Sequence, residues 1–321
     1  MVPSHPDTPK LHLQERDMAI LEGFLVSRVM TSAHVAALFF DGRAEAAKKR
    51  LQKLKAEGLV AERPRKVSEP AILYLTKTGI EMLGKEGVLV RHPPLSVSTL
   101  ARRASVSPLT IGHEIAVMEF RVALHAAVSK QSQWQMVEFS TWPKLHEFES
   151  ETAGGVPITV RPDGFVRIHE TETSGIAEHV FFAEIDRSSE SLDTLVQKAI
   201  GYLNFYRSGA FAVRCGGKRA DAVKFPFRVL FVLKTEERRN NFAERLLRSH
   251  PPILTMAYLA TAADAEADPL GKVWMRPIDY RDAVAGSKFD VVDSPVRFAF
   301  QRNSAREALV RGRVPLHKLL G

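Results

Sequence analysis

The chain has 321 residues, of which 45% are hydrophobic and 26% charged, and its formal net charge is +8. These values indicate a globular protein of two domains, or of one domain with a small module in front, and they favour a polyanionic partner. The single Cys215 excludes a disulfide framework and a cysteine-based zinc site. Because no signal pattern and no run of 18 apolar residues occurs, we expect a cytoplasmic protein without a membrane partner.

The positive charge is concentrated at the two ends of the chain. Residues 1–108 contain 17 Lys and Arg against 11 Asp and Glu, a net charge of +6. Residues 286–321 form a basic tail with 7 against 3, a net charge of +4, so the middle of the chain is left at −2. Basic ends around a mildly acidic centre favour a protein that contacts backbone phosphates outside a metal-holding pocket.

The first third of the chain has the pattern of a winged helix-turn-helix. Residues 15–28, 31–40 and 43–57 carry apolar side chains at helical spacing. Two short apolar runs, at 59–62 and 71–78, follow them and are joined by a basic turn. This order predicts a DNA-binding domain over residues 1–87, with its third helix in the major groove and the basic turn on the backbone.

The candidate DNA contacts are basic or amide side chains of the third helix and of the turn after it. They are Arg43, Lys49, Arg50, Gln52, Lys53, Arg63, Arg65 and Lys66. We expect double-stranded DNA as the partner. Because side chains of this kind often contact phosphate rather than bases, the sequence does not predict which bases are recognised. The alternative interpretation is a solvated basic helix with no partner. Residues 88–108 contain Pro and Ser without a sustained period, and we interpret them as a linker.

The middle of the chain, residues 109–285, alternates helices with strands. This predicts an α/β (α+β) domain with a mixed sheet and helices on its faces. The predicted helices are 109–129, 190–207 and 236–249, and the predicted strands are 133–140, 159–168, 179–186, 227–233 and 256–262.

Acidic residues in this domain form a candidate catalytic site. Strand alternation puts Glu184 and Asp186 on the same side of one strand, and Asp163 begins the neighbouring strand. Converging carboxylates repel one another unless a hard cation such as Mg²⁺ or Mn²⁺ lies between them. Such an ion could polarise a phosphodiester and activate water. Lys198, on the next predicted helix, could stabilise the transition state.

The same residues also have an interpretation without chemistry. Asp163 and Gly164 follow a proline, as in an ordinary turn, and the two acidic residues at the end of the next strand could be solvated or cap a helix. Lys198 could be a surface residue. His113 and Glu114, near the start of the helix over 109–129, are weaker candidates, because a lone histidine there is more often structural.

The block that contains these residues resembles the PD-(D/E)XK nuclease superfamily. Asp163 matches its Asp and Glu184 its Glu, so the resemblance implies that these two hold the metal. Asp186 occupies the position of the superfamily's Lys, and Lys198 is the candidate for a basic residue that has moved to the following helix. Glu114 matches an additional acidic residue on the first core helix of many members.

Over residues 12–280 the layout resembles the replication-relaxation family of bacterial plasmids and mobile elements. The matching features are the winged-helix start, the helix with His113, and the segments RPDGFVRI (161–168), FFAEIDRSSESL (181–192) and LATAADAEADPLGKVWMRP (259–277). This resemblance implies a role in plasmid replication and DNA relaxation. Replication or conjugation proteins are then expected as partners beside DNA.

Two functions follow from these patterns. The first is a DNA-processing enzyme, in which the winged helix binds duplex DNA and the core nicks or cleaves it with a divalent metal. The second is a non-catalytic DNA-binding protein that recruits replication machinery or regulates transcription. A homodimer would match two half-sites in either case. A metabolic enzyme is disfavoured, since the sequence has no Gly-rich phosphate loop and no Gly-x-Ser-x-Gly.

Overall fold

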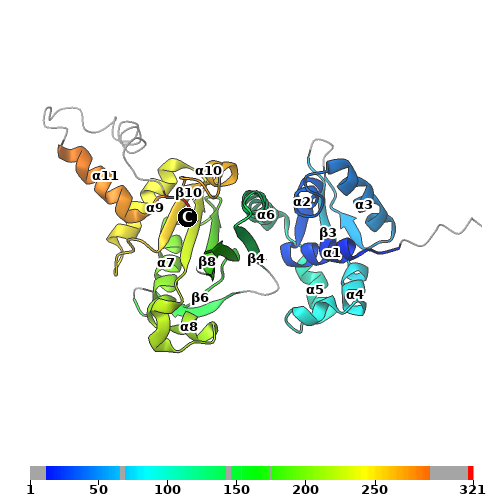
Figure 1. Ribbon diagram of the computed structural model, residues 1–321, viewed down its shortest axis with the longest axis horizontal. Coiled ribbons are helices and arrows are strands. Elements are labelled where there is room, and N and C mark those ends of the chain that lie inside the picture. The colour runs from blue at the N-terminus through cyan, green and yellow to red at the C-terminus, as the bar shows by residue number, and fades with distance from the viewer. Residues whose placement is uncertain are drawn as a thin grey trace, which may run out of the picture. The chain divides into compact units, whose positions relative to one another are not determined.

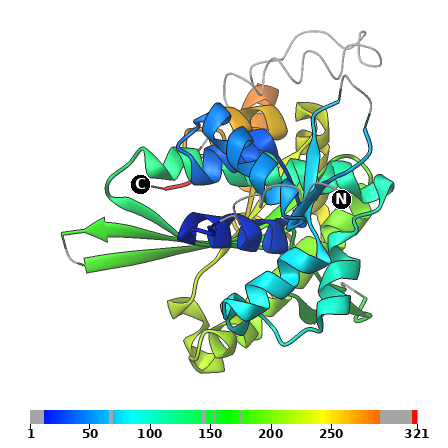
Figure 2. The ribbon, with the colours of Figure 1, turned by 90° about the vertical axis from the view of Figure 1, so that its right-hand side faces the viewer.

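A computed structural model describes residues 12–65, 69–141, 146–152, 154–173, 175–289 and 317–320 of the chain. The chain divides into two compact units, the first reaching Met118 and the second beginning at Glu119 (Figures 1 and 2). Both units combine helices with a sheet, which confirms the expected mixed α/β class. In the described part of the chain, no helix has the length and apolar character needed to cross a bilayer.

The first unit packs its helices around a small antiparallel sheet with the strand order β1–β3–β2. Its elements are α1 (Glu15–Ser27), β1 (Val29–Thr31), α2 (Ser32–Phe39), α3 (Ala44–Ala56), β2 (Val60–Glu62), β3 (Ile72–Leu75), α4 (Lys77–Lys85), the 3-10 helix η1 (Val88–Arg91) and α5 (Val97–Ala104). Helix α6 (Pro108–Ser129) begins in this unit and continues into the second. Ala47, Leu51 and Leu54 of α3 are buried, as helical spacing predicts.

The segment expected to be a linker, residues 88–108, contains η1 and α5. Ser96 caps α5 by accepting a hydrogen bond from the backbone N–H of Thr99. Leu100 and Ala104, four residues apart, are buried on one side of the helix, which packs against α4. These residues therefore add to the core of the first unit.

The second unit contains a five-stranded mixed sheet with the order β10–β9–β8–β7–β4. Its elements after α6 are β4 (Trp134–Ser140), β5 (Phe148–Glu151), β6 (Pro157–Val160), β7 (Gly164–Glu172), β8 (Gly175–Asp186), α7 (Leu192–Arg207), α8 (Ala210–Arg214), the 3-10 helix η2 (Arg219–Lys224), β9 (Arg228–Leu233), α9 (Glu236–Arg248), β10 (Ala257–Thr261), α10 (Ala262–Ala267) and α11 (Pro277–Phe289). Strands β4, β7 and β8 are antiparallel neighbours, whereas β8, β9 and β10 run parallel.

In the sheet of the second unit, the end of β8 and nearly all of β9 and β10 are buried on both faces. Phe182 of β8 and Phe231 of β9 form a core with α7 and α9, which lie against the sheet (Figure 1). On the opposite face, Phe139 and Phe181 lie in register with Val166 between them. The ring of Phe120 on α6 lies 6.4 Å from that of Phe139, centroid to centroid. The site described below lies on the face covered by α7.

The single strand predicted over residues 159–168 is wrong, because the chain forms two strands there. Strand β6 ends at Val160 and pairs with β5 in a separate two-stranded sheet, and β7 starts at Gly164 in the main sheet. Pro162, between them, has no N–H to donate to a ladder, which favours a break at this place. Asp163 therefore lies immediately before β7, in a connecting segment.

The expected basic tail, residues 286–321, begins inside α11, and residues 290–316 lie outside the described part of the chain. The end of the chain packs on the second unit. His317 forms an isolated bridge with Trp274, and its Nε2 lies 2.9 Å from Oδ2 of Asp279. Leu319 and Leu320 are buried.

Candidate functional site

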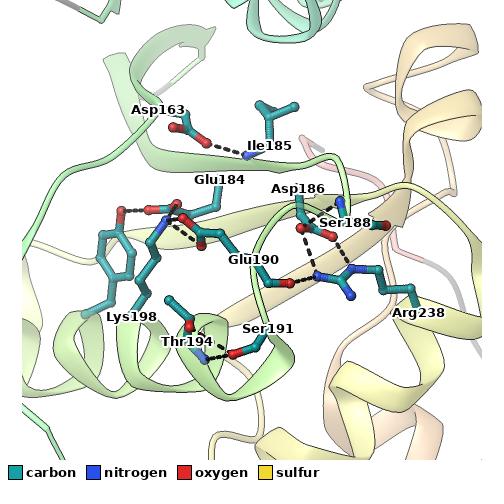
Figure 3. A network of polar contacts seen from close by, with 11 residues as sticks. Asp163, Glu184, Ile185, Asp186, Ser188, Glu190, Ser191, Thr194, Lys198 and Arg238 are labelled. Atoms are coloured by element: carbon teal, nitrogen blue, oxygen red, sulfur yellow. Dashed lines mark hydrogen bonds and ion pairs between the residues drawn. The ribbon is translucent and has the colours of Figure 1, made fainter. Parts of the chain in front are cut away.

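Asp163 is hydrogen-bonded to the backbone of strand β8 at two points. Its backbone N–H donates to the carbonyl of Ala183 at 3.0 Å, and its Oδ2 accepts a hydrogen bond from the N–H of Ile185 at 2.7 Å. These two contacts flank Glu184, so the carboxyl groups of Asp163 and Glu184 come from adjacent strand ends. Figure 3 shows the Asp163 side chain above β8 and the Glu184 side chain below it, toward Lys198.

Glu184 lies in β8 with its side chain only 1% exposed, and α7 supplies its partners. The hydroxyl of Tyr202 donates to Oε1 at 2.6 Å, and Nζ of Lys198 lies 3.2 Å from Oε2 (Figure 3). Lys198 and Tyr202 are four residues apart, so they lie on the same face of the helix. Ser191 caps α7 by accepting from the N–H of Thr194, which fixes where the helix begins.

Glu190, in the loop between β8 and α7, is a third carboxylate at this place. Its Oε2 lies 3.0 Å from Nζ of Lys198. The Lys198 side chain is 24% exposed, so the ammonium reaches toward solvent while its partner Glu184 is buried. One ammonium is therefore shared between two carboxylates, and the charge of Asp163 acts on both Glu184 and Lys198.

Electrostatics distinguish this cluster from an ordinary surface ion pair. Burial raises the pKa of the Glu184 carboxyl to about 7; attraction to Lys198 opposes the change and repulsion from Asp163 adds to it. Burial alone would lower the pKa of Lys198, but attraction to Glu184, Asp163 and Glu190 raises it. Burial, together with the negative charge of Glu184, also raises the pKa of the Tyr202 phenol, which keeps it a donor. The cluster has an excess of negative charge around one cation.

Asp186 lies on the same face of β8 but has its own partners. Its carboxylate accepts two N–H bonds from the guanidinium of Arg238 on α9, and the N–H of Ser188 donates to Oδ1 at 3.0 Å (Figure 3). Arg238 also donates to the carbonyl of Glu190 at 2.6 Å. The structure therefore brings Asp163, Glu184 and Lys198 together and holds Asp186 in a neighbouring ion pair.

The donor set suits a hard divalent cation with two protein ligands. Among the described residues, no group of three or more His, Cys, Asp or Glu side chains has the arrangement of a metal site. Mg²⁺ commonly takes only one or two carboxylates and completes its coordination with water and phosphate oxygens. Asp163 and Glu184 supply two such carboxylates, and their mutual repulsion is the kind that a cation relieves.

Sequence reasoning missed Tyr202, Glu190 and Arg238. Tyr202 carried a signal, because it stands four residues after Lys198 on the predicted helix. Glu190 lies in a loop and Arg238 is 52 residues from Asp186 in the sequence, so no local spacing points to either. Glu114 and His113 lie in the part of α6 that belongs to the first unit, where Glu114 is ion-paired with Arg28. Their role in a site stays a prediction.

The candidate DNA contacts of the first unit differ in how they are held. Lys49, Gln52 and Lys53 are exposed along α3, and neither lysine has an ion-pair partner among the described residues. Arg50 instead donates two N–H bonds to the carboxylate of Asp17, whose side chain is buried. That contact links α3 to α1 within the first unit.

The remaining candidates have local partners. Arg43 contacts Asp41 at 2.9 Å, Arg63 donates to the carbonyl of Val106, and Arg65 contacts Glu62 at 2.9 Å. Lys66 lies outside the described residues. DNA contact by this set stays a prediction.

Comparison with known proteins identifies a family. A family model described as replication-relaxation matches residues 26–218, more than half of the 321-residue chain. The matched segment includes α3 of the first unit and the Asp163, Glu184 and Lys198 cluster of the second. No curated protein and no solved structure matches the chain. The chain belongs to the replication-relaxation family.

Proposed function

We propose that this protein binds double-stranded DNA of plasmids or mobile elements and cleaves a phosphodiester with a divalent metal in its second unit. Family membership suggests the coarser role, in the replication or relaxation of such DNA. The observation that carries the proposed chemistry is the convergence of Asp163, Glu184 and Lys198, with the buried Glu184 held by two donors.

The arrangement of the first unit supports DNA binding. The order of α1, β1, α2, α3, β2 and β3, with β3 central in the sheet, is the order of a winged helix-turn-helix. In this interpretation α3 is the recognition helix and the β2–β3 hairpin is the wing. Lys49, Gln52 and Lys53 on the exposed side of α3 have the charge and hydrogen-bonding groups to contact a DNA groove and backbone.

The second unit supports a PD-(D/E)XK-like interpretation. An acidic residue precedes one strand of a mixed sheet, a second lies in the antiparallel neighbour, and a lysine follows on the next helix. Parallel strands β9 and β10 extend the sheet on the other side of β8. In the superfamily pattern the lysine stands at the position of Asp186. Here Lys198 on α7 would take its place, as expected for a basic residue that has moved to the following helix.

Each residue of the cluster then has a distinct role. Asp163 and Glu184 would hold Mg²⁺ or Mn²⁺, which when bound polarises the phosphodiester and lowers the pKa of a water molecule. Tyr202 orients the Glu184 carboxylate through its hydrogen bond. The ammonium of Lys198, partly exposed and protonated, would stabilise the negative charge that develops on the phosphate oxygens.

Supercoiled plasmid tests this proposal. The purified protein is incubated with plasmid in Mg²⁺ or Mn²⁺, beside an EDTA control and an Asp163→Ala/Glu184→Ala double variant. Nicked or linear product from the wild type, lost in EDTA and in the double variant, is the expected result. Cleavage that survives both substitutions would contradict the assignment of these residues.

A non-catalytic DNA-binding protein is the second candidate function. The observation that favours it is that Lys198 is already neutralised by Glu184 and Glu190, and that Asp186, where the nuclease pattern has a lysine, is held by Arg238. This candidate predicts intact plasmid in every metal, with the DNA retarded on a gel. It also predicts that the double variant retards DNA as the wild type does.

A further inference from the structure

A cavity lies in the second unit, apart from the acidic cluster of Asp163, Glu184 and Glu190. It has a volume of about 520 Å³ and lies where the end of α7 meets the starts of β9 and β10. Its lining includes Val180 of β8, which is on the same strand face as Glu184 but four residues away, about 13 Å along the strand. Because Glu184 and Lys198 do not line it, the cavity is a separate feature.

Two of the three arginines that line this cavity are available to a ligand. Arg207, in the last turn of α7, and Arg228, the first residue of β9, are exposed, and within the described ranges neither has an ion-pair partner. The third, Arg276, is held by both oxygens of Asp279, at 2.8 and 2.7 Å. The acidic residue in the lining, Glu178, contacts Arg167 and His169. The cavity therefore presents two guanidinium groups that are not neutralised by its own walls.

Aromatic rings stand beside these guanidinium groups. The guanidinium carbon of Arg228 lies 5.3 Å from the ring centroid of Tyr258. Tyr206 also lines the cavity, and its ring packs edge-on against Phe227, with 5.8 Å between the centroids. Arginine forks bind phosphate oxygens in a bidentate manner, and aromatic faces stack with nucleobases. A volume of about 520 Å³ is within the usual range for small-ligand sites.

We infer that this cavity binds a nucleotide, with its phosphate on Arg207 and Arg228 and its base against the ring of Tyr206. The nucleotide can come from two sources, a free mononucleotide or one residue of a DNA single strand, and the chemistry of recognition is the same for both. The inference uses none of the residues of the acidic cluster, so it does not depend on DNA cleavage by that cluster.

Isothermal titration in EDTA, with the full chain, tests this site. The probes are thymidine 5′-monophosphate and a 5′-phosphorylated tetrathymidylate. We expect at least one probe to bind the wild type, and Arg207→Ala/Arg228→Ala to weaken that binding at least about tenfold, since each substitution removes a charge-assisted contact. Tighter binding of the mononucleotide would identify a free nucleotide as the ligand, and tighter binding of the tetranucleotide would identify a strand.

Two control variants separate this site from general charge effects and from the acidic cluster. Lys224→Ala/Arg248→Ala removes the same charge from exposed positions outside the cavity and should leave binding unchanged. Glu184→Gln should also leave it unchanged. Circular dichroism checks that each variant is folded, and Arg207→Gln, at an exposed position of α7, replaces the double variant if that does not fold. Failure of both probes to bind, or equal binding by the folded arginine variant, would overturn the inference.

Discussion

Two buried carboxylates on one face of β8, Glu184 and Asp186, are balanced in different ways. Asp186 accepts two N–H bonds from Arg238 and a third from the backbone of Ser188. Glu184 has one neutral donor, Tyr202, and an ammonium that it shares with Glu190. Both side chains are only 1% exposed. Burial therefore does not distinguish the two carboxylates. They differ in the number and geometry of their hydrogen-bond donors.

The two carboxylates differ in how completely the neighbouring cation, Arg238 or Lys198, pairs with their oxygens. The planar guanidinium of Arg238 matches both oxygens of one carboxylate, so Asp186 is fully paired inside the protein. The compact ammonium of Lys198 faces Glu184 and Glu190, with Asp163 nearby, and leaves an excess of negative charge. A fully paired carboxylate suits a structural role, whereas an unbalanced one suits the binding of a further cation.

The largest expected effect is on stability at Asp186. The substitution Asp186→Asn leaves Arg238 without its charged partner, and breaking a buried pair in this way costs about 3–5 kcal/mol. Urea unfolding measures the free energy. Asp193→Asn, at an exposed carboxylate paired with Arg245, is the matched control and should change stability little. Equal losses of unfolding free energy in the two variants would show that the Asp186–Arg238 pair contributes no more than an exposed ion pair.

The next effect is on DNA cleavage at Lys198. The substitution Lys198→Met keeps most of the aliphatic side chain and removes the ammonium, so we expect cleavage to slow by about 10²–10³-fold. Single-turnover nicking of supercoiled plasmid measures the rate. Lys224→Met, at an exposed lysine of η2, serves as the control. A wild-type rate in Lys198→Met would remove this ammonium from the mechanism.

A smaller effect is expected on DNA affinity in the first unit. Lys49→Ala/Lys53→Ala should weaken duplex binding about tenfold at 0.15 M salt and reduce the slope of log affinity against log salt by about two. Fluorescence anisotropy over a salt series gives both values. Lys77→Ala/Lys85→Ala, on exposed positions of α4, removes the same charge elsewhere. If both pairs reduce affinity equally, α3 has no particular role in binding.

The last effect is a pH dependence of stability at Glu184. Because the pKa of Glu184 is raised from 4.5 to about 7, the folded state binds this proton more tightly than the unfolded chain does. The stability it contributes is complete below pH 4.5 and is lost as the pH rises through about 7. Glu184→Gln, which mimics the neutral carboxyl, should therefore gain roughly 2–3 kcal/mol over the wild type between pH 5 and pH 8.

Urea unfolding in EDTA at the two pH values measures this difference. A wild type and a Glu184→Gln variant whose stabilities change in parallel with pH would contradict the raised pKa. The Asp186→Asn variant, measured under the same conditions, shows whether the dependence belongs to Glu184 or to the neighbouring pair.

Much of the fold was predictable where periodic patterns are long. The alternation of 180–186 placed Glu184 and Asp186 on one face of the strand, and helical spacing placed Leu51 and Leu54 of α3 in the core. Short elements were not predictable in the same way. Strand β1 has three residues and β5 and β6 have four each, too few for a period to appear.

The helix α5 could have been found, because Ser96 is a capping residue and Leu100 and Ala104 follow at helical spacing. Its two prolines upstream and its serines favoured the linker interpretation instead. The candidate site was predictable to the level of Asp163, Glu184 and Lys198. Arg238 was not, because its contact with Asp186 depends on how α9 packs beside β8, which no local pattern encodes.

The most direct test is a comparison of Glu184→Gln with Asp186→Asn in the nicking of supercoiled plasmid in Mg²⁺, at a temperature where circular dichroism shows both variants folded. If the unbalanced carboxylate holds the metal and the paired one is structural, Glu184→Gln abolishes nicking and Asp186→Asn keeps most of it. Nicking by Glu184→Gln at the wild-type rate, or equal losses in the two folded variants, would contradict that division of roles.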